Sequence, residues 1–303
     1  KARFDEEHNI EWARTLEKEG VHVVYGQIEL KTHAKVALVV RRERDVVRRY
    51  MHLGTGNYNA STARVYEDYA LLTCNPDLGA DASNLFNALT GYARGIQYNK
   101  LLVAPETLRP GLLMRIEREI KQHLAGGRGR LVFKVNSLVD PEIIRSLYRA
   151  SQAGVQIDLI VRGICCLRPG VPGVSENIRV RSLVGRQLEH SRVYYFANGG
   201  LDEDELYLGS ADLMQRNLDH RVEVLFPILD SSLRGMLRDV TLPQYFRDTV
   251  NARELLPNGE YVHVEPRDDE PPFDVQTWFA HTGDLRADDT TPILLRAGLR
   301  TTR

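Results

Sequence analysis

Apolar and polar positions along the first hundred residues predict one helix followed by short strands. Apolar residues recur at helical spacing between Asp5, a suitable N-cap, and Lys18, and Gly20 then ends this helix. Shorter apolar runs predict strands at 21–25, 35–40, 46–53 and 69–73, with a charged turn at 41–45 between the second and the third.

From residue 110 onward the pattern becomes an alternation of strands and helices. Pro110 opens a helix that runs to a Gly-Gly stop at 126–127, and Asp140-Pro141 caps a second helix. A third helix is predicted over 231–247, and strands over 131–135, 155–161, 179–184, 192–197, 205–208 and 221–226. This order predicts an α/β layer structure with largely parallel strand pairing.

Residues 251–303 lose this periodicity because prolines and a Pro-Asn-Gly turn interrupt it. We predict an extended or partly disordered C-terminal tail here and assign it no chemistry. The chain is thus expected to contain two tandem domains, 1–105 and 106–250, followed by the tail 251–303.

Composition and charge narrow the class of protein only slightly. The chain has 303 residues and a formal net charge of −1. Ten acidic and six basic side chains in 251–303 leave a net charge of +3 on the first 250 residues, which is too small to indicate nucleic-acid binding. Three cysteines give no disulfide framework, and no apolar run is long enough to span a membrane. The chain begins with Lys-Ala-Arg-Phe rather than Met, so we expect a fragment that lacks an N-terminal portion.

Two stretches of the sequence look like copies of each other. The first carries His33 and Lys35, and the second carries His190 and Arg192, each as His-x-cation at the start of a predicted strand. A repeat of this size predicts two similar half-domains that face each other. We expect the two histidines to converge on one cationic cavity.

Each half continues with a glycine turn and then a carboxylate at a matching distance. Asp68 lies 14 positions after Gly54, and Glu223 lies 14 positions after Gly209. We expect these carboxylates to hold a ring N–H of the histidines and so fix the tautomer, as in a catalytic triad. The turns at 54–57 and 209–212 are expected to aim backbone N–H groups at an oxyanion.

These residue types suit chemistry on a phosphate. A neutral imidazole is a nucleophile for phosphorus near pH 7, and a second imidazole can protonate or polarise the leaving oxygen. Lys35, Arg192, Arg3 and Arg162 offer cationic donors for phosphate oxygens. No P-loop motif is present, so a phosphate enzyme built here would not be a P-loop enzyme.

Two features have open interpretations. Tyr66 is either a core side chain or a platform on which a base stacks. The basic run at 41–49 is either a solvated hairpin or a guide for a polyanion.

The paired His-x-Lys/Arg and Gly-(Thr/Ser)-x-(Asn/Asp) pattern resembles the phospholipase D superfamily. The acid usual in that superfamily seven residues after the histidine is absent, because Val40 and Ala197 occupy those positions. Longer strings resemble bacterial polyphosphate kinase of the first type: KARFDEE at 1–7, LKTHAK at 30–35, HLGTGNYN at 52–59, LIVRGIC at 159–165 and LEHSRVY at 188–194. The likeness runs from residue 1 to about residue 255 and covers that family's two C-terminal, phospholipase D-like α/β/α domains, related by a pseudo-two-fold axis.

This resemblance implies reversible transfer of the ATP γ-phosphate to inorganic polyphosphate, through a phosphohistidine and with Mg²⁺. Carried over by position, His33 would be the phosphorylated nucleophile and His190 the acid/base partner on the nucleotide side. Tyr66, Arg162 and His190 would contact ATP or ADP. Arg3 matches a position in the metal–phosphate region, where we interpret it as a phosphate contact because a guanidinium cannot ligate Mg²⁺.

The resemblance also implies a homodimer or larger assembly that is cytoplasmic or peripheral at the inner membrane. Two alternatives come from other classes of protein. One is a phospholipase D-like phosphodiesterase, which the residues at 40 and 197 count against. The other is a non-catalytic polyanion-binding fragment, which would bind polyphosphate equally well with both histidines replaced.

Overall fold

The computed structural model describes residues 6–26, 29–91, 95–200, 203–282 and 293–297. The elements of the first part are α1 (Glu6–Lys18), β1 (Lys31–Thr32), β2 (Lys35–Glu43), β3 (Val46–Gly54), the 3-10 helix η1 (Thr62–Arg64), β4 (Tyr66–Thr73), α2 (Pro76–Leu89) and β5 (Leu102–Ala104). The central part contains α3 (Leu108–Leu124), β6 (Arg130–Val135), α4 (Pro141–Gln152), β7 (Gln156–Val161), β8 (Ile178–Leu183), β9 (Leu188–Glu189), β10 (Arg192–Phe196), β11 (Glu205–Gly209), α5 (Gln215–Asp219) and β12 (Arg221–Pro227). The last part contains α6 (Ser231–Gly235), the π-helical segment η2 (Met236–Thr241), α7 (Leu242–Tyr245), β13 (Ala252–Leu255), β14 (Tyr261–His263), α8 (Val275–Thr282) and β15 (Ile293–Ala297).

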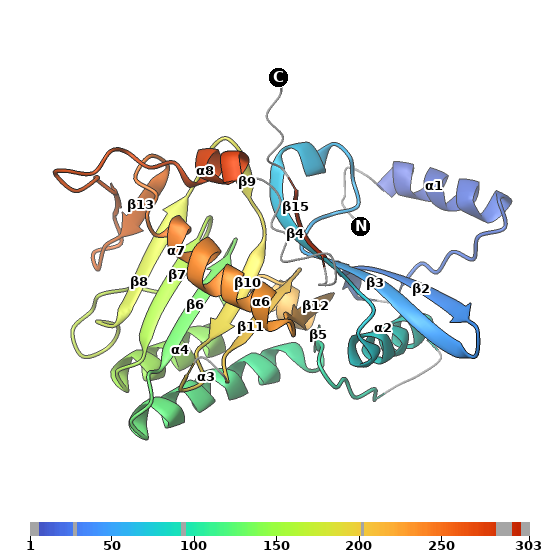
Figure 1. The fold of residues 1–303 in the computed structure, drawn as a ribbon, viewed down its shortest axis with the longest axis horizontal. Coiled ribbons are helices and arrows are strands. Elements are labelled where there is room, and N and C mark those ends of the chain that lie inside the picture. The colour runs from blue at the N-terminus through green and yellow to red at the C-terminus, as the bar shows by residue number, and fades with distance from the viewer. Residues whose placement is uncertain (1–5, 27–28, 92–94, 201–202, 283–292, 298–303) are drawn as a thin grey trace.

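The chain forms a mixed α/β fold built on two sheets (Figure 1). The main sheet has ten strands in the order β1-β12-β11-β10-β6-β7-β8-β13-β14, with β5 also paired to β12. The smaller sheet has five strands in the order β15-β4-β3-β2, with β9 paired to β4. We divide the chain into a first part, up to residue 100, and a second part that follows it. β1 of the main sheet comes from the first part and β9 of the smaller sheet from the second, so the two parts exchange strands.

The main sheet is covered on both faces, and its side chains alternate between two apolar cores. Phe133 of β6 faces the helices α3 and α4, whereas its neighbour Val132 faces the opposite core. That second core contains side chains from α6, η2 and α7, and also Leu53, Tyr69 and other residues of the smaller sheet and α2. The smaller sheet therefore shares a core with the main sheet, which ties the two parts of the chain together.

Local sequence signals account for most of the helices. Asp140 caps α4 by accepting from the N–H groups of Glu142 and Ile143, and Gly154 follows the helix with a positive φ of 98°. The predicted helices at 5–18, 110–126, 140–154 and 231–247 are confirmed over their described residues, although the last contains the π-helical turn η2. Helix α2, capped by Asn75, was not predicted.

Two expectations about strands were wrong or incomplete. Residues 21–25 form no strand, and Val21, Val24 and Tyr25 are exposed, because none of the strands that the structure describes pairs with them. The main sheet is parallel only between β6, β7 and β8 and between β1 and β12, and its other pairs are antiparallel. Periodicity reveals that a strand is buried but not the direction of its partner.

The expected extended tail is instead structured over much of its described length. β13 pairs with β8 and adds an edge to the main sheet, and β15 pairs with β4 in the smaller sheet. Helix α8 packs Val275 and Phe279 into a third apolar cluster with Tyr245. Proline interruptions separate these short elements, so they escape a search for long periodic segments.

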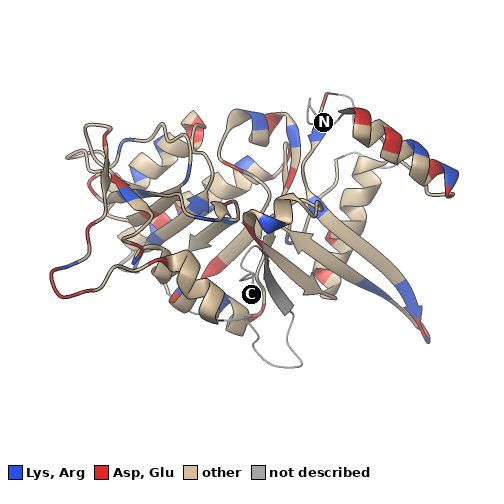
Figure 2. Cartoon of the chain, turned by 90° about the horizontal axis from the view of Figure 1, so that it is seen from above, with Lys and Arg blue, Asp and Glu red and all other residues tan. Residues whose placement is uncertain are grey.

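The basic run at 41–49 lies on the hairpin of β2 and β3, which extends from the smaller sheet (Figure 2). Arg41 and Arg48 lie directly opposite each other on this hairpin, and both are exposed and lie near Glu43. The turn is only two residues long, and Arg44 occupies it with a positive φ of 53°. The run is therefore an exposed hairpin.

A matched pair of substitutions on α3 tests the first core. Leu112 is 0% exposed, whereas Met114 on the same helix is 57% exposed. We expect Leu112→Ala to lower the free energy of unfolding by about 2–5 kcal/mol, because it removes buried methyl groups and leaves a cavity. Met114→Ala should change it by less than about 0.5 kcal/mol. Urea unfolding followed by circular dichroism measures both, and similar effects for the two variants would contradict this core assignment.

Candidate active site

His33 lies directly after β1, the two-residue strand at one end of the main sheet. β1 pairs in parallel with β12, and the N–H of His33 donates to the carbonyl of Val222 at 2.9 Å. This register places the imidazole beside Glu223 of β12, whose Oε2 lies 2.8 Å from Nδ1. Glu223 is completely buried. Because a carboxylate only accepts, Nδ1 donates, and in the neutral imidazole Nε2 keeps the lone pair.

His190 has the same local structure in the second part of the chain. It follows the two-residue strand β9, which pairs in parallel with β4, and the N–H of Ser191 donates to the carbonyl of Glu67 at 3.0 Å. The imidazole Nδ1 lies 2.8 Å and 3.0 Å from the two carboxylate oxygens of Asp68 on β4. Each histidine is thus oriented by a carboxylate from the other part of the chain.

Each carboxylate is itself held by the glycine turn of its own part. The hydroxyl of Thr55 donates to Asp68 at 2.6 Å, and the hydroxyl of Ser210 donates to Glu223 at 2.5 Å. Each hydroxyl also accepts from the backbone N–H that follows its carboxylate, at 3.0 and 3.1 Å. The equal 14-residue spacing seen in the sequence therefore reflects a turn hydroxyl that fixes a carboxylate.

Within the turns 54–57 and 209–212, the backbone N–H groups of Thr55 and Ser210 take part in strand pairing. Their backbone N–H groups donate to the carbonyls of Tyr69 and Val224 at 2.9 and 3.0 Å. These contacts continue the pairing between neighbouring strands, so neither N–H is left for a ligand. The oxyanion role is therefore not available to these two N–H groups, and it stays a prediction for the other N–H groups of the two turns.

The two cations are positioned alike. Lys35 Nζ donates to the carbonyl of His33 at 2.5 Å, and Arg192 Nη1 donates to the carbonyl of His190 at 2.6 Å. Both side chains are buried, at 5% and 3% exposed. Arg192 also contacts Asp212 through Nε at 3.2 Å and Nη2 at 3.0 Å, so its charge is compensated.

The same two cations influence the pKa of both histidines. Burial lowers the pKa of both imidazoles, and Lys35 and Arg192 each lower the pKa of both further, against the opposite effects of Glu223 on His33 and Asp68 on His190. Both imidazoles are therefore neutral at neutral pH. Burial, assisted by Arg192, lowers the pKa of Lys35 to about 7.

The predicted nucleotide contacts lie beside His190. The ring centroid of Tyr66 is 4.8 Å from that of His190, with the planes tilted by 44°. Arg162 follows β7 and donates through Nε to Asn136 Oδ1 at 3.0 Å, and Asn136 Nδ2 donates to the carbonyl of His190 at 3.3 Å. Burial lowers the pKa of Arg162, and Arg192 contributes to this effect. Tyr66, Arg162, Arg192 and His190 therefore form one side of the site.

Two asparagines of the site were missed in the sequence. Asn136 links Arg162 to the backbone of His190, and Asn217 Nδ2 donates to Glu223 Oε1 at 2.7 Å. Asn136 directly follows the predicted strand 131–135, so its place at a strand end was an available signal. Asn217 lies on the short helix α5, which was not predicted, and nothing in the sequence pattern marks it.

Arg3 lies outside the described residues. Among the residues that the structure describes, no group of three or more His, Cys, Asp or Glu side chains is arranged to hold a metal ion. Asp68 and Glu223, the carboxylates nearest to the histidines, are engaged by imidazole and hydroxyl groups. The described side chains therefore do not form a Mg²⁺ site by themselves.

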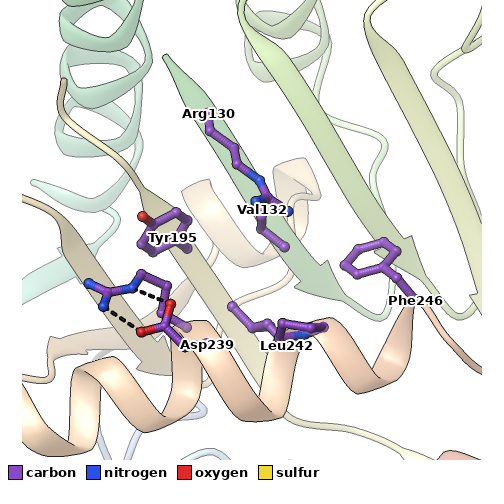
Figure 3. A pocket seen from close by; sticks show the side chains of 8 residues that line it. Arg130, Val132, Tyr195, Asp239, Leu242 and Phe246 are labelled. Atoms are coloured by element: carbon purple, nitrogen blue, oxygen red, sulfur yellow. Dashed lines mark hydrogen bonds and ion pairs between the residues drawn. The ribbon is translucent and has the colours of Figure 1, made fainter. Parts of the chain in front are cut away.

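A pocket of about 230 Å³ lies elsewhere, between the main sheet and the segment η2–α7 (Figure 3). It is lined by Arg130, Val132, Tyr195, Arg238, Asp239, Leu242, Pro243 and Phe246. Arg238 is held by Asp239 and by the buried Asp204. None of the predicted site residues lines this pocket, so it is separate from the histidine site.

Fold and site together define a mixed α/β protein with duplicated histidine–carboxylate pairs beside shared cations. The family model described as polyphosphate kinase C-terminal domain 1 matches residues 1–95, and the one described as polyphosphate kinase C-terminal domain 2 matches residues 101–276. The chain belongs to the polyphosphate kinase family, as the resemblance of its sequence strings implied.

Individual relatives agree with this assignment. A polyphosphate kinase of Prosthecochloris aestuarii is 56% identical over 286 residues, which are 94% of this chain and 39% of the relative. A polyphosphate kinase of Synechocystis is 60% identical over 266 residues, 88% of this chain and 36% of the relative. The crystal structure of polyphosphate kinase from Porphyromonas gingivalis superposes with a TM-score of 0.82 at 40% identity, covering 92% of this chain and 42% of that one. The chain thus spans well under half the length of these relatives.

Among the helices that the structure describes, none combines the length and the apolar character needed to cross a membrane.

The ammonium of Lys35 provides a direct test of this electrostatic description. Its pKa is lowered to about 7, so without a ligand the amine should lose its proton as the pH rises through neutrality. Binding of inorganic tripolyphosphate should raise this pKa, because an adjacent anion favours the ammonium form. Nitrogen-15 NMR of labelled lysine measures both titrations, with Lys35→Met to assign the signal. An ammonium that titrates only above pH 10 without tripolyphosphate would contradict the description.

Gly56 tests the contact between Asp68 and His190. A Cβ at Gly56 would lie 2.3 Å from Asp68 Oδ2, whereas a Cβ at Gly200 would have nothing within 4 Å. We expect Gly56→Ala to displace the carboxylate and to abolish the Nδ1–H signal of His190 in imidazole NMR spectra. Gly200→Ala should leave this signal in place. An unchanged His190 signal in Gly56→Ala would show that the turn does not hold Asp68.

Proposed function

We propose that this chain forms the phosphate-transferring part of an ATP:polyphosphate phosphotransferase, a polyphosphate kinase. The reaction is the reversible transfer of the ATP γ-phosphate to inorganic polyphosphate through a phosphohistidine. The observation that carries the proposal is the pair of neutral, carboxylate-oriented imidazoles that share Lys35 and Arg192, in a chain that belongs to the polyphosphate kinase family.

In the first step, Nε2 of His33 attacks the γ-phosphorus of ATP. An N–P bond forms, the bond between the γ-phosphorus and the bridging oxygen breaks, and the electron pair leaves with ADP. Glu223 keeps the proton on Nδ1, so that the lone pair stays on Nε2. In the second step, a terminal phosphate oxygen of polyphosphate attacks the phosphohistidine and releases His33.

His190 serves the nucleotide side as acid and base. Its Nδ1 contacts Asp68, so Nε2 is the atom that exchanges a proton with the leaving phosphate oxygen. Its lowered pKa keeps it neutral before ATP binds, and the arriving triphosphate raises that pKa by placing negative charge nearby. Tyr66 and Arg162 lie beside His190, where they can contact the nucleotide.

Lys35 and Arg192 stabilise the transferring phosphoryl group. Phosphoryl transfer depends mainly on positioning and on neutralisation of charge, and buried cations act strongly because little water screens them. Binding of the triphosphate raises the pKa of Lys35 and keeps it charged during transfer. Mg²⁺, when bound with the nucleotide, would supply further positive charge to the phosphate oxygens.

The proposal also includes the arrangement of the domains. We propose two tandem phospholipase D-like α/β/α domains related by a pseudo-two-fold axis. Support comes from matched local structure: each part supplies a histidine after a two-residue strand, a buried cation two positions later, and a carboxylate held by a turn hydroxyl.

The proposal is tested by trapping the phosphoenzyme. Incubation of the intact protein with ATP labelled in the γ-phosphate should leave acid-labile, base-stable label on the protein. His33→Ala should carry none of it, because the attacking nitrogen is gone. His263→Ala is the matched control, since that histidine is exposed and remote from the site in sequence. Label that survives in His33→Ala would remove His33 from the nucleophile role.

A further inference from the structure

The segment that carries His190 has little regular structure of its own. Residues 184–187 form no helix or strand, and β9 contains only two residues before the histidine. On one side, the segment is held by β4 and the residue before it: the N–H of Leu188 donates to the carbonyl of Val65, and that of Ser191 donates to the carbonyl of Glu67 on β4. The position of the imidazole therefore also depends on the residues that contact this segment from the side opposite β4.

That other side is held by Gln276 of the C-terminal helix α8. Its side-chain oxygen accepts from the N–H of Gln187 at 2.8 Å, and its amide nitrogen donates to the carbonyl of the same residue at 2.8 Å. The amide nitrogen also donates to Glu189 Oε1 at 2.7 Å. Gln276 is only 4% exposed, and a Cβ at Gly185 would lie 2.6 Å from its side-chain oxygen. One buried amide thus makes three hydrogen bonds to the segment that leads into His190.

A buried lysine contacts residues on both sides of His190 in the sequence. Lys134 of β6 contacts Glu189 at 2.9 Å and Glu67 at 3.0 Å, and its Nζ donates to the hydroxyl of Ser191 at 2.8 Å. Glu189 and Ser191 flank His190, and Glu67 precedes the Asp68 that orients it. Lys134 is 1% exposed, so these contacts are shielded from water.

Helix α8 is firmly attached to the domain. The carboxylate of the buried Asp248 accepts from the N–H of Val275 at 2.8 Å, and the rings of Tyr245 and Phe279 lie 5.4 Å apart. Tyr245 also donates to Glu67 Oε1 at 3.3 Å. A residue far along the chain is therefore part of the rigid surroundings of His190.

We propose that Gln276 is a positioning residue for His190: it clamps the segment 187–189 and so holds the imidazole against Asp68. The proposal rests on the role of His190 in the proposed phosphotransfer. The side chain of Gln276 contacts Gln187 and Glu189 rather than the imidazole itself. It acts by keeping the His190–Asp68 pair in one geometry, whereas the His33–Glu223 pair is held separately by Ser210 and Asn217.

The first test is spectroscopic and needs no turnover. In the intact protein with nitrogen-15-labelled histidine, Gln276→Ala should broaden or abolish the Nδ1–H signal of His190 and leave that of His33 unchanged. Thr277→Ala is the matched control, because Thr277 is exposed on the same helix and should affect neither signal. Equal effects on both histidines would show a general loss of structure, and no effect on His190 would overturn the proposal.

The second test separates positioning from binding. We expect Gln276→Ala to lower kcat by up to about 100-fold with little change in the KM for ATP, because a misplaced acid/base group affects the transition state more than substrate binding. A rise in KM with unchanged kcat would overturn the assignment. If the wild-type protein forms no phosphohistidine, the proposed function fails, and the spectroscopic test still decides the role of Gln276.

Complementary substitutions at Gln276 and Glu189 distinguish loss of this contact from loss of folding. Gln276→Glu places a second carboxylate against Glu189 and should impair the enzyme as much as Gln276→Ala. The double variant Glu189→Gln with Gln276→Glu restores a donor and an acceptor at this contact, and should recover part of the lost kcat. Additive losses in the double variant would show that the two side chains do not act together.

Discussion

The structure depends on one constraint: each histidine is oriented by a carboxylate from the other part of the chain. Glu223 on β12 contacts His33, and Asp68 on β4 contacts His190. The contacts arise because β1 and β9 are short strands that pair in parallel across the two parts. Neither part can complete its own imidazole–carboxylate pair, so assembly of the site and association of the two sheets are a single event.

This constraint explains why so many polar groups are buried at the interface. A buried charge is strongly unfavourable unless it is paired and hydrogen-bonded. Here Arg192 is paired with Asp212, Lys134 lies between Glu67 and Glu189, and turn hydroxyls satisfy the carboxylates. Lys35 differs from these charges, because it donates to the carbonyl of His33 rather than to a carboxylate. Burial lowers its pKa to about 7. An anionic phosphate beside Lys35 would favour its charged form, which connects the electrostatics of the site to its proposed chemistry.

Local patterns were sufficient for the long helices, for most of the central strands and for the equal spacing of turn and carboxylate in each part. Asp140-Pro141 and Gly154 marked α4 correctly, and short apolar runs marked the central strands of the main sheet. Local patterns failed where contacts with residues distant in the sequence determine the secondary structure. The apolar run at 21–25 pairs with none of the described strands. The short elements after residue 251 form because they pair with sheet edges and pack on apolar surfaces that the rest of the chain provides.

By itself, the sequence determined that the protein carries a duplicated histidine–cation motif with carboxylates at equal spacing, because these are local and countable features. Only the tertiary structure decided that the carboxylates are exchanged between the two parts and that Gln276 reaches the segment before His190. The physical reason is that strand exchange and a docked C-terminal helix are long-range pairings. Their partners are separated by up to 190 residues, so no local pattern encodes them.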